Sequence, residues 1–168
     1  AEARSYRPRI GALAGADLDD YLYPSAVSPP LRELYRRLGD RIAKRVGIDL
    51  RRYGVGRSDR LAATNPAVGI LQDVANELKL GELEVYVSKE QPTIAVAEPT
   101  SPISLVIGEA LLTPDKPMQL RFLAGRCLKL VSAGLAVPAR VSARDFGLLR
   151  SGLIRQFQTD LTVSGLER

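Results

Sequence analysis

A chain of 168 residues is long enough to bury one hydrophobic core, and its apolar (45%) and charged (26%) fractions are typical of folded globular proteins. The chain has no histidine and a single cysteine, Cys127, which excludes Ser-His-Asp and Cys-His catalysis, histidine-ligated zinc and an internal disulfide within it. Its net charge is +5, and residues 32–60 alone carry ten basic and four acidic side chains, so an electrostatic partner is expected to meet that segment.

Residues 1–30 are predicted to form an arm or linker, because they mix Gly, Pro and Ser with an acidic stretch and end in Ser28-Pro29-Pro30. A single domain is expected over residues 31–168. The first residue is alanine and no signal-peptide pattern follows it, which suggests an excised fragment whose own start is missing.

Four helices are predicted in this domain. The first covers residues 31–46 and is amphipathic, and the second begins at Asn65-Pro66 and ends at Gly81. Both are expected to pack on a sheet. A third helix begins at Pro117, and a fourth follows Ser142, which with Asp145 resembles a capping box.

Three strands are predicted between the second and third helices, at residues 83–88, 93–97 and 103–107, because these runs are β-branched and bounded by Pro or Gly. The short connections between them favour an antiparallel meander over parallel crossovers. The expected fold class is therefore α+β, with a small three-stranded, mainly antiparallel sheet packed against about four helices.

Three segments follow one another in an order that points to a known family: T-I-A-V-A at 93–97, S-L-V-I-G-E-A-L-L at 104–112 and M-Q-L-R-F-L-A-G-R-C-L-K at 118–129. Within residues 83–131 this order resembles the core of the gluzincin metallopeptidases of the HtpX and CAAX prenyl protease group. In that family a strand and a G-L-L turn lead into an E-L-x-A-V-L-A-H-E-L-G-H helix. The resemblance implies a metallopeptidase-like core.

The residues that the family uses for chemistry are replaced. The resemblance places Gly125 and Lys129 at the positions of the two zinc-binding histidines, and Arg126 at that of the catalytic glutamate. Gly offers no ligand, and Arg and Lys repel a dication. We therefore expect a pseudoenzyme with no catalytic residue, no metal and no cofactor.

The same resemblance suggests how a partner is bound. In such peptidases the strand before the active helix pairs with extended substrate, which makes that strand the candidate edge for a partner strand: Ile103, Ser104, Leu105, Val106 and Ile107. The expected function is a non-catalytic protein-interaction or structural module of a larger bacterial protein. Its partner is another protein or other domains of the same chain.

An alternative is nucleic-acid or acidic-partner binding through segment 32–60. The candidate basic patch is Arg32, Arg36, Arg37, Arg41 and Arg45. Arginines on an exposed helix face are more often simply solvated, and only Tyr35 and Tyr53 offer stacking surfaces in that segment, so this alternative is not favoured. The lone cysteine predicts a cytoplasmic location, and no apolar run is long enough for a membrane span.

Overall fold

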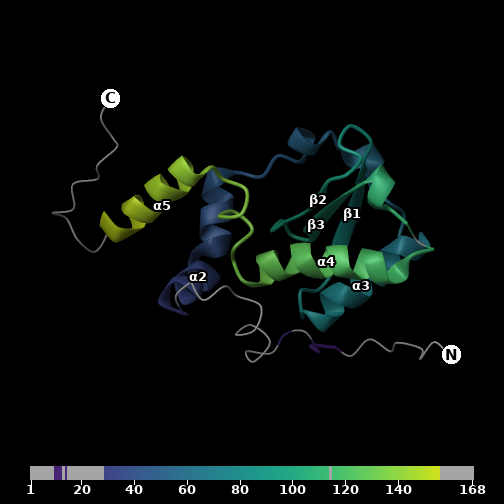
Figure 1. Cartoon of the computed structure of the whole chain (residues 1–168), viewed down its shortest axis with the longest axis horizontal. Helices are drawn as coiled ribbons and strands as arrows, with labels where there is room; N and C mark the ends of the chain where they lie inside the picture. The colour runs from purple at the N-terminus through teal and green to yellow at the C-terminus, as the bar shows by residue number, and fades with distance from the viewer. Residues whose placement is uncertain (1–9, 13, 15–28, 114, 156–168) are drawn as a thin grey trace.

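The computed structural model describes residues 10–12, 14, 29–113 and 115–155. In this part of the chain, four α-helices and a three-stranded sheet confirm the α+β class (Figure 1). Helix α2 begins at Pro29, and the expected arm at residues 1–30 lies almost wholly outside the described residues. None of the helices in the described ranges is long and apolar enough to cross a bilayer.

The sheet is mixed, so the expected meander is wrong. Strands β1 (Leu83–Ser88), β2 (Ala95–Glu98) and β3 (Ile103–Gly108) lie in the order β1-β3-β2. Strand β3 runs parallel to β1 and antiparallel to β2. The crossover from β1 to β3 contains β2 itself, which provides the dozen or more residues that a parallel connection needs.

The connection at residues 89–94 passes over the end of β3 to reach the far edge of the sheet. The Gly108 N–H donates to the Ile94 carbonyl at 2.7 Å, and the Ala110 N–H donates to that of Pro92 at 3.0 Å. A Cβ at Gly108 would lie 2.2 Å from the Pro92 carbonyl oxygen, so only glycine fits there. Because six residues easily span two strand spacings of about 4.8 Å each, loop length did not determine the strand order.

Helices α3 (Pro66–Glu77) and α4 (Pro117–Ser132) cover one face of the sheet. The predicted start of α3 is confirmed, because Asn65 Oδ1 accepts from the Ala67 N–H at 2.9 Å and Pro66 takes the first helical position. The core between helices and sheet is formed mainly by Leu71, Val74, Val85, Leu105, Ile107, Leu120 and Leu128.

The opposite face of the sheet is covered by the short 3-10 helix η1 (Leu50–Tyr53) and the residues after it. Tyr53 and Val55 pack there against Tyr86 of β1 and Val106 of β3. Helix η2 (Arg57–Asp59) follows, and the Leu61 N–H donates to the Val85 carbonyl at 2.8 Å, which partly closes the outer edge of β1. A third such helix, η3 (Glu109–Leu111), follows β3.

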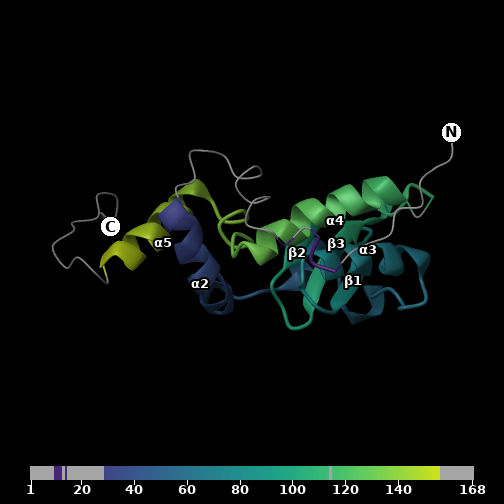
Figure 2. The same cartoon turned by 90° about the horizontal axis from the view of Figure 1, so that it is seen from below.

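Helices α2 (Pro29–Val46) and α5 (Ala143–Arg155) form a separate group, the α2–α5 lobe, beside the sheet (Figure 2). The expectation that the first helix packs on the sheet is therefore wrong. Its close contact is with the end of α4, where a Cβ on Gly39 would lie 2.7 Å from the Gly134 Cα. The predicted Ser142 cap of α5 is confirmed, since the Asp145 N–H donates to Ser142 Oγ at 3.1 Å. The Asp145 carboxylate accepts from the Ser142 hydroxyl at 2.7 Å, whereas in a full capping box it would accept from the Ser142 backbone N–H.

Candidate functional site

Strand β3 does not offer the edge that the sequence predicted. Residues Ile103, Ser104, Leu105, Val106 and Ile107 lie in the middle of the sheet, paired with β1 on one side and β2 on the other. All but Ile103 are buried. No backbone edge of β3 is left for a partner strand, so the prediction of a partner-binding edge at these residues is wrong.

The three positions that the resemblance assigns to lost chemistry lie on α4. Arg126 is exposed, while Gly125 and Lys129 are half-buried one turn apart. A Cβ at Gly125 would meet no atom within 4 Å, so its surroundings are open. In the described ranges no group of three or more His, Cys, Asp or Glu side chains is placed to hold a metal ion.

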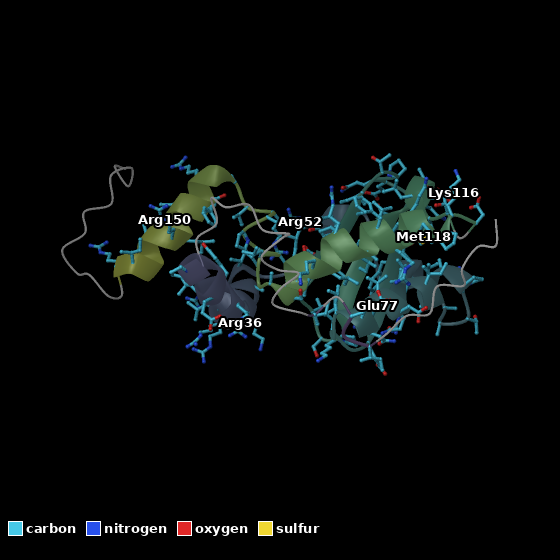
Figure 3. The ribbon with its side chains drawn as sticks, turned by 60° about the horizontal axis from the view of Figure 1, so that its bottom comes forward. Arg36, Arg52, Glu77, Lys116, Met118 and Arg150 are labelled. Carbon is cyan, nitrogen blue, oxygen red and sulfur yellow. The ribbon has the colours of Figure 1, made fainter. Side chains whose placement is uncertain are left out.

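Two large apolar side chains continue this face of α4 toward its start. Met118 is 67% exposed and Phe122 is 71% exposed. At about 100° per residue, Met118, Phe122, Gly125 and Lys129 fall along one line of the helix, which we call the α4 stripe. Figure 3 shows Met118 with Lys116 at the end of the molecule away from the α2–α5 lobe.

The α4 stripe was missed by sequence reasoning, although a signal was present. The apolar face predicted for this helix was built on Leu120, Leu123 and Cys127, and Met118 and Phe122 fall outside it. Apolar residues that share helical spacing but lie off the core face are a recognisable sign of a second contact surface.

The predicted basic patch is divided by the geometry of α2. Arg36 and Arg37 both donate to Glu33, Arg36 at 2.8 Å, and these hydrogen bonds lower the pKa of Glu33 to about 2. Arg41 and Arg45 are exposed and have no ion-pair partner among the described residues. Arg32 belongs to α2, but its side chain lies outside the description.

Helix α5 adds arginines that no sequence pattern groups with those of α2. Arg144, Arg150 and Arg155 are exposed on α5, and Figure 3 shows Arg150 and Arg36 at the same end of the molecule. Tyr35 of α2 stacks on Phe146 of α5, with ring centroids 5.8 Å apart and planes 23° apart. The α2–α5 lobe is therefore basic on both of its helices.

The rest of segment 32–60 lies elsewhere and is partly paired. Arg51 donates to Asp49 at 2.9 Å, and Arg60 lies 2.8 Å from Glu84 of β1. Because these arginines belong to the sheet side of the molecule, the segment does not present one continuous basic face.

A groove runs between α2 and α5. It has a volume of about 210 Å³ and is lined by Leu38, Arg41, Ile42, Arg45, Val46 and Leu149. Its floor is apolar, and the two arginines stand at its margin.

A larger hollow, of about 660 Å³, lies between α2, the β2–β3 turn and the end of α4. Arg36 and Lys44 bring positive charge to its lining, and Glu82 brings negative charge. This mixture favours no particular ligand charge.

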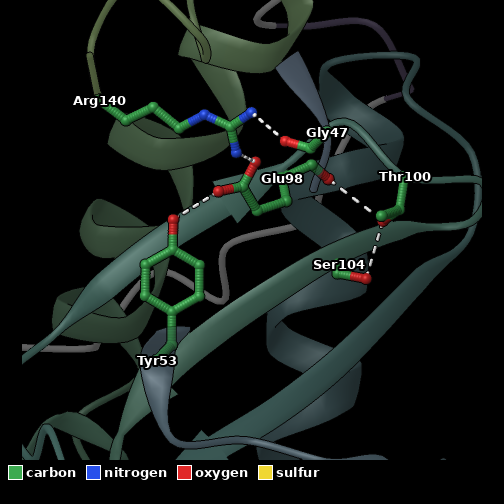
Figure 4. Close-up of polar contacts among 6 residues, drawn as sticks. All are labelled: Gly47, Tyr53, Glu98, Thr100, Ser104 and Arg140. Atoms are coloured by element: carbon green, nitrogen blue, oxygen red, sulfur yellow. Dashed lines mark hydrogen bonds and ion pairs between the residues drawn. The ribbon is translucent and has the colours of Figure 1, made fainter. Parts of the chain in front are cut away.

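One buried polar cluster lies where β2, η1 and the α4–α5 connection meet (Figure 4). The fully buried Glu98 accepts hydrogen bonds from the Tyr53 hydroxyl and from Arg140, which also donates to the Gly47 carbonyl at 3.1 Å. Burial raises the pKa of Tyr53 to about 12, and the hydrogen bond to the Glu98 carboxylate adds to the shift. A phenol with so high a pKa stays protonated near neutral pH and is not suited to acid-base catalysis. We therefore interpret the cluster as a structural one that holds the three segments together.

No protein-family model matches the chain, and neither a curated protein nor a solved structure proved similar to it. The gluzincin resemblance therefore stays a prediction.

Proposed function

We propose that this chain is a non-catalytic protein-interaction module of a bacterial cytoplasmic protein, related to the gluzincin peptidases, that contacts its partner through the α4 stripe. One observation carries the proposal: Met118 and Phe122 stand exposed one turn apart on the helix face that also bears Gly125 and Lys129. The partner is another protein or another domain of the same polypeptide.

The energetic argument rests on the size of these two side chains. Burying a Met or Phe side chain contributes about 1.5–3 kcal/mol of favourable free energy. Two such side chains that face solvent next to each other do not make this contribution in the isolated chain, and a partner that covers them gains it on binding. Met and aromatic residues are enriched in protein interfaces, and anchors of this kind supply most of the binding energy there. Gly125 leaves the middle of the stripe shallow, which gives a partner side chain room to enter.

Nucleic-acid binding through the basic patch is less well supported. Single-stranded nucleic acid is held by exposed aromatic rings as well as by charge. Tyr35 and Tyr53 are both buried, at 1% and 6% exposure, and Arg36 and Arg37 are already engaged by Glu33. The nuclease treatment in the capture experiment tests this alternative.

The test is affinity capture of partners from a lysate of the source organism with the full-length protein, comparing wild type, Phe122→Ser and Gln119→Ser. Gln119 is also exposed on α4 and lies off the stripe, so Q119S places the same residue type on the same helix. Because serine has about the helix propensity of phenylalanine and a lower one than glutamine, Q119S bears the larger propensity cost of the two variants. Because Phe122 is 71% exposed, F122S is expected to change the free energy of unfolding by no more than about 0.5 kcal/mol.

We expect a defined protein to be captured by wild type and Q119S and lost from F122S, with nuclease treatment making no difference. Equal capture by all three proteins, or capture that disappears after nuclease treatment, would overturn the proposal.

A further inference from the structure

The side chains of α2 are ordered around its axis in three rows. At about 100° per residue, Tyr35, Gly39 and Ala43 form the row that faces the rest of the protein, and all three are buried. The next row is apolar and consists of Leu38, Ile42 and Val46. The row after that is basic and consists of Arg37, Arg41 and Arg45.

The apolar row is only partly covered by α5. Leu149 closes one side of the groove, but Val46 remains 45% exposed. The floor is thus continuous along the last turns of α2 and open to solvent. A ligand for it must present apolar side chains at helical spacing.

The charged side chains at the margin of the groove narrow the choice of ligand. Arg37 is held by Glu33, whereas Arg41 and Arg45 have no ion-pair partner in the part of the chain that the structure describes. These two guanidinium groups lie one turn apart, and residues so spaced have Cβ atoms about 5–6 Å apart. Carboxylates one turn apart on a facing helix match this spacing.

We propose that the groove between α2 and α5 binds an acidic amphipathic helix of a partner protein. Its apolar face rests on Leu38, Ile42 and Val46, and its carboxylates pair with Arg41 and Arg45. This surface lies at the end of the molecule opposite Met118, so it adds a second contact to the proposed interaction function and does not depend on the first (Figure 3).

Other occupants fit less well. A nucleic-acid backbone offers nothing apolar for the floor, and Tyr35 and Phe146 are stacked on each other, so neither is free to stack on a base. A second copy of the lobe would bring arginines of α2 and α5 against arginines of the same kind. Like charges placed together cost several kcal/mol, which disfavours self-association through this face.

The experiment measures fluorescence anisotropy of a labelled synthetic peptide of about 15 residues, roughly four helical turns, added to the full chain. Its leucines repeat at helical spacing and glutamates fill the other positions. A scrambled peptide of the same composition has no apolar face. The protein variants are Ile42→Ser, Arg41→Glu with Arg45→Glu, and Arg57→Glu with Lys89→Glu, two exposed residues outside the lobe that give a matched change in net charge.

We expect the amphipathic peptide to bind at least about tenfold more tightly than the scrambled one. I42S and R41E/R45E should each weaken its binding about tenfold or more, while R57E/K89E leaves it within about twofold. Since Arg41 and Arg45 are exposed, R41E/R45E tests the proposal even if I42S disturbs folding.

Three outcomes overturn the inference: no binding of the amphipathic peptide, equal binding of the scrambled peptide, or displacement of the peptide by duplex DNA of equal total charge at lower concentration. F122S separates the two proposals. It should bind the peptide as wild type does, so loss of peptide binding in F122S counts against this groove only. Capture of the partner by F122S at the wild-type level counts against the α4 stripe only.

Discussion

At Glu98, three separate parts of the chain meet over one buried carboxylate. Tyr53 reaches it from η1, and Arg140 reaches it from the connection between α4 and α5. Arg140 also binds the Gly47 carbonyl just after α2, so the cluster ties both ends of the α2–α5 lobe to the sheet. The contacts join residues more than 40 positions apart, and no local sequence pattern announces them.

Removing Arg140 should therefore destabilise the whole fold. The Arg140 side chain is 8% exposed and that of Glu98 is fully buried, so Arg140→Ala leaves a carboxylate without its counter-charge. Breaking a buried pair in this way costs about 3–5 kcal/mol. Urea unfolding of R140A should show that loss as a lower midpoint.

The matched control is Arg60→Ala, which removes a side chain that is 53% exposed in its ion pair with the 22% exposed Glu84. An ion pair with this access to water contributes about 0–1 kcal/mol, so R60A should unfold close to wild type. Equal urea midpoints for R140A and R60A would contradict a stabilising role of the buried pair between Arg140 and Glu98.

Among the elements, helix α4 and the turn after it hold two glycines with opposite roles. Gly134 has φ +70°, and a Cβ there would lie 2.1 Å from the Tyr35 carbonyl oxygen of α2. Gly125 lies inside the helix, and a Cβ there meets nothing. One glycine is required by close packing, and the other is a weak point of the helix.

Alanine at the two positions should therefore change stability in opposite directions. Gly134→Ala should cost at least about 1–3 kcal/mol, because of backbone strain and because α2 must move away. Gly125→Ala should gain about 0.5–1 kcal/mol by reducing the entropy of the unfolded chain. Thermal unfolding of both variants checks this, and a shift of the same sign in both would contradict it.

The helix starts were predictable from sequence and the strand order was not. Asn65-Pro66 and Ser142 with Asp145 act through hydrogen bonds within three residues, so their pattern is complete in the local sequence. The order β1-β3-β2 depends on the connection at residues 89–94, which crosses the end of β3. Gly108 is the one residue that marks this crossing, but the reason why position 108 requires glycine is seen only once Pro92 lies against it.

In the molecule as a whole, the candidate surfaces also depend on contacts between segments that are distant in sequence, which local patterns do not reveal. The apolar periodicity of α2 was visible in the sequence, but Leu38, Ile42 and Val46 face the groove with α5 and not the sheet. Periodicity tells that a helix has an apolar face and leaves open what covers it. The grouping of α2 with α5 depends on Tyr35 and Phe146, which are far apart along the chain.

Buried tyrosine hydroxyls and the buried cysteine thiol lie in several parts of the described fold. Burial raises the pKa of Tyr35 in the lobe, of Tyr53 and Tyr86 beneath the sheet, and of the Cys127 thiol in the core. A group whose pKa is higher in the folded than in the unfolded state stabilises the fold below its unfolded pKa, and this contribution is lost as pH rises through the folded pKa.

Stability should consequently fall on the alkaline side, beginning near the ordinary thiol pKa of about 8.5 and continuing past the ordinary phenol pKa of about 10.

Tyr53→Phe tests the largest of these shifts, since Tyr53 titrates at about 12 in the folded protein. At neutral pH, Y53F should be less stable than wild type because Glu98 loses a hydrogen bond. Above pH about 10 the wild type loses the contribution of its phenol and the variant has none to lose, so the two curves of unfolding free energy against pH should converge. Curves that stay parallel from neutral to alkaline pH would show that Tyr53 titrates alike in both states and would contradict its burial against Glu98.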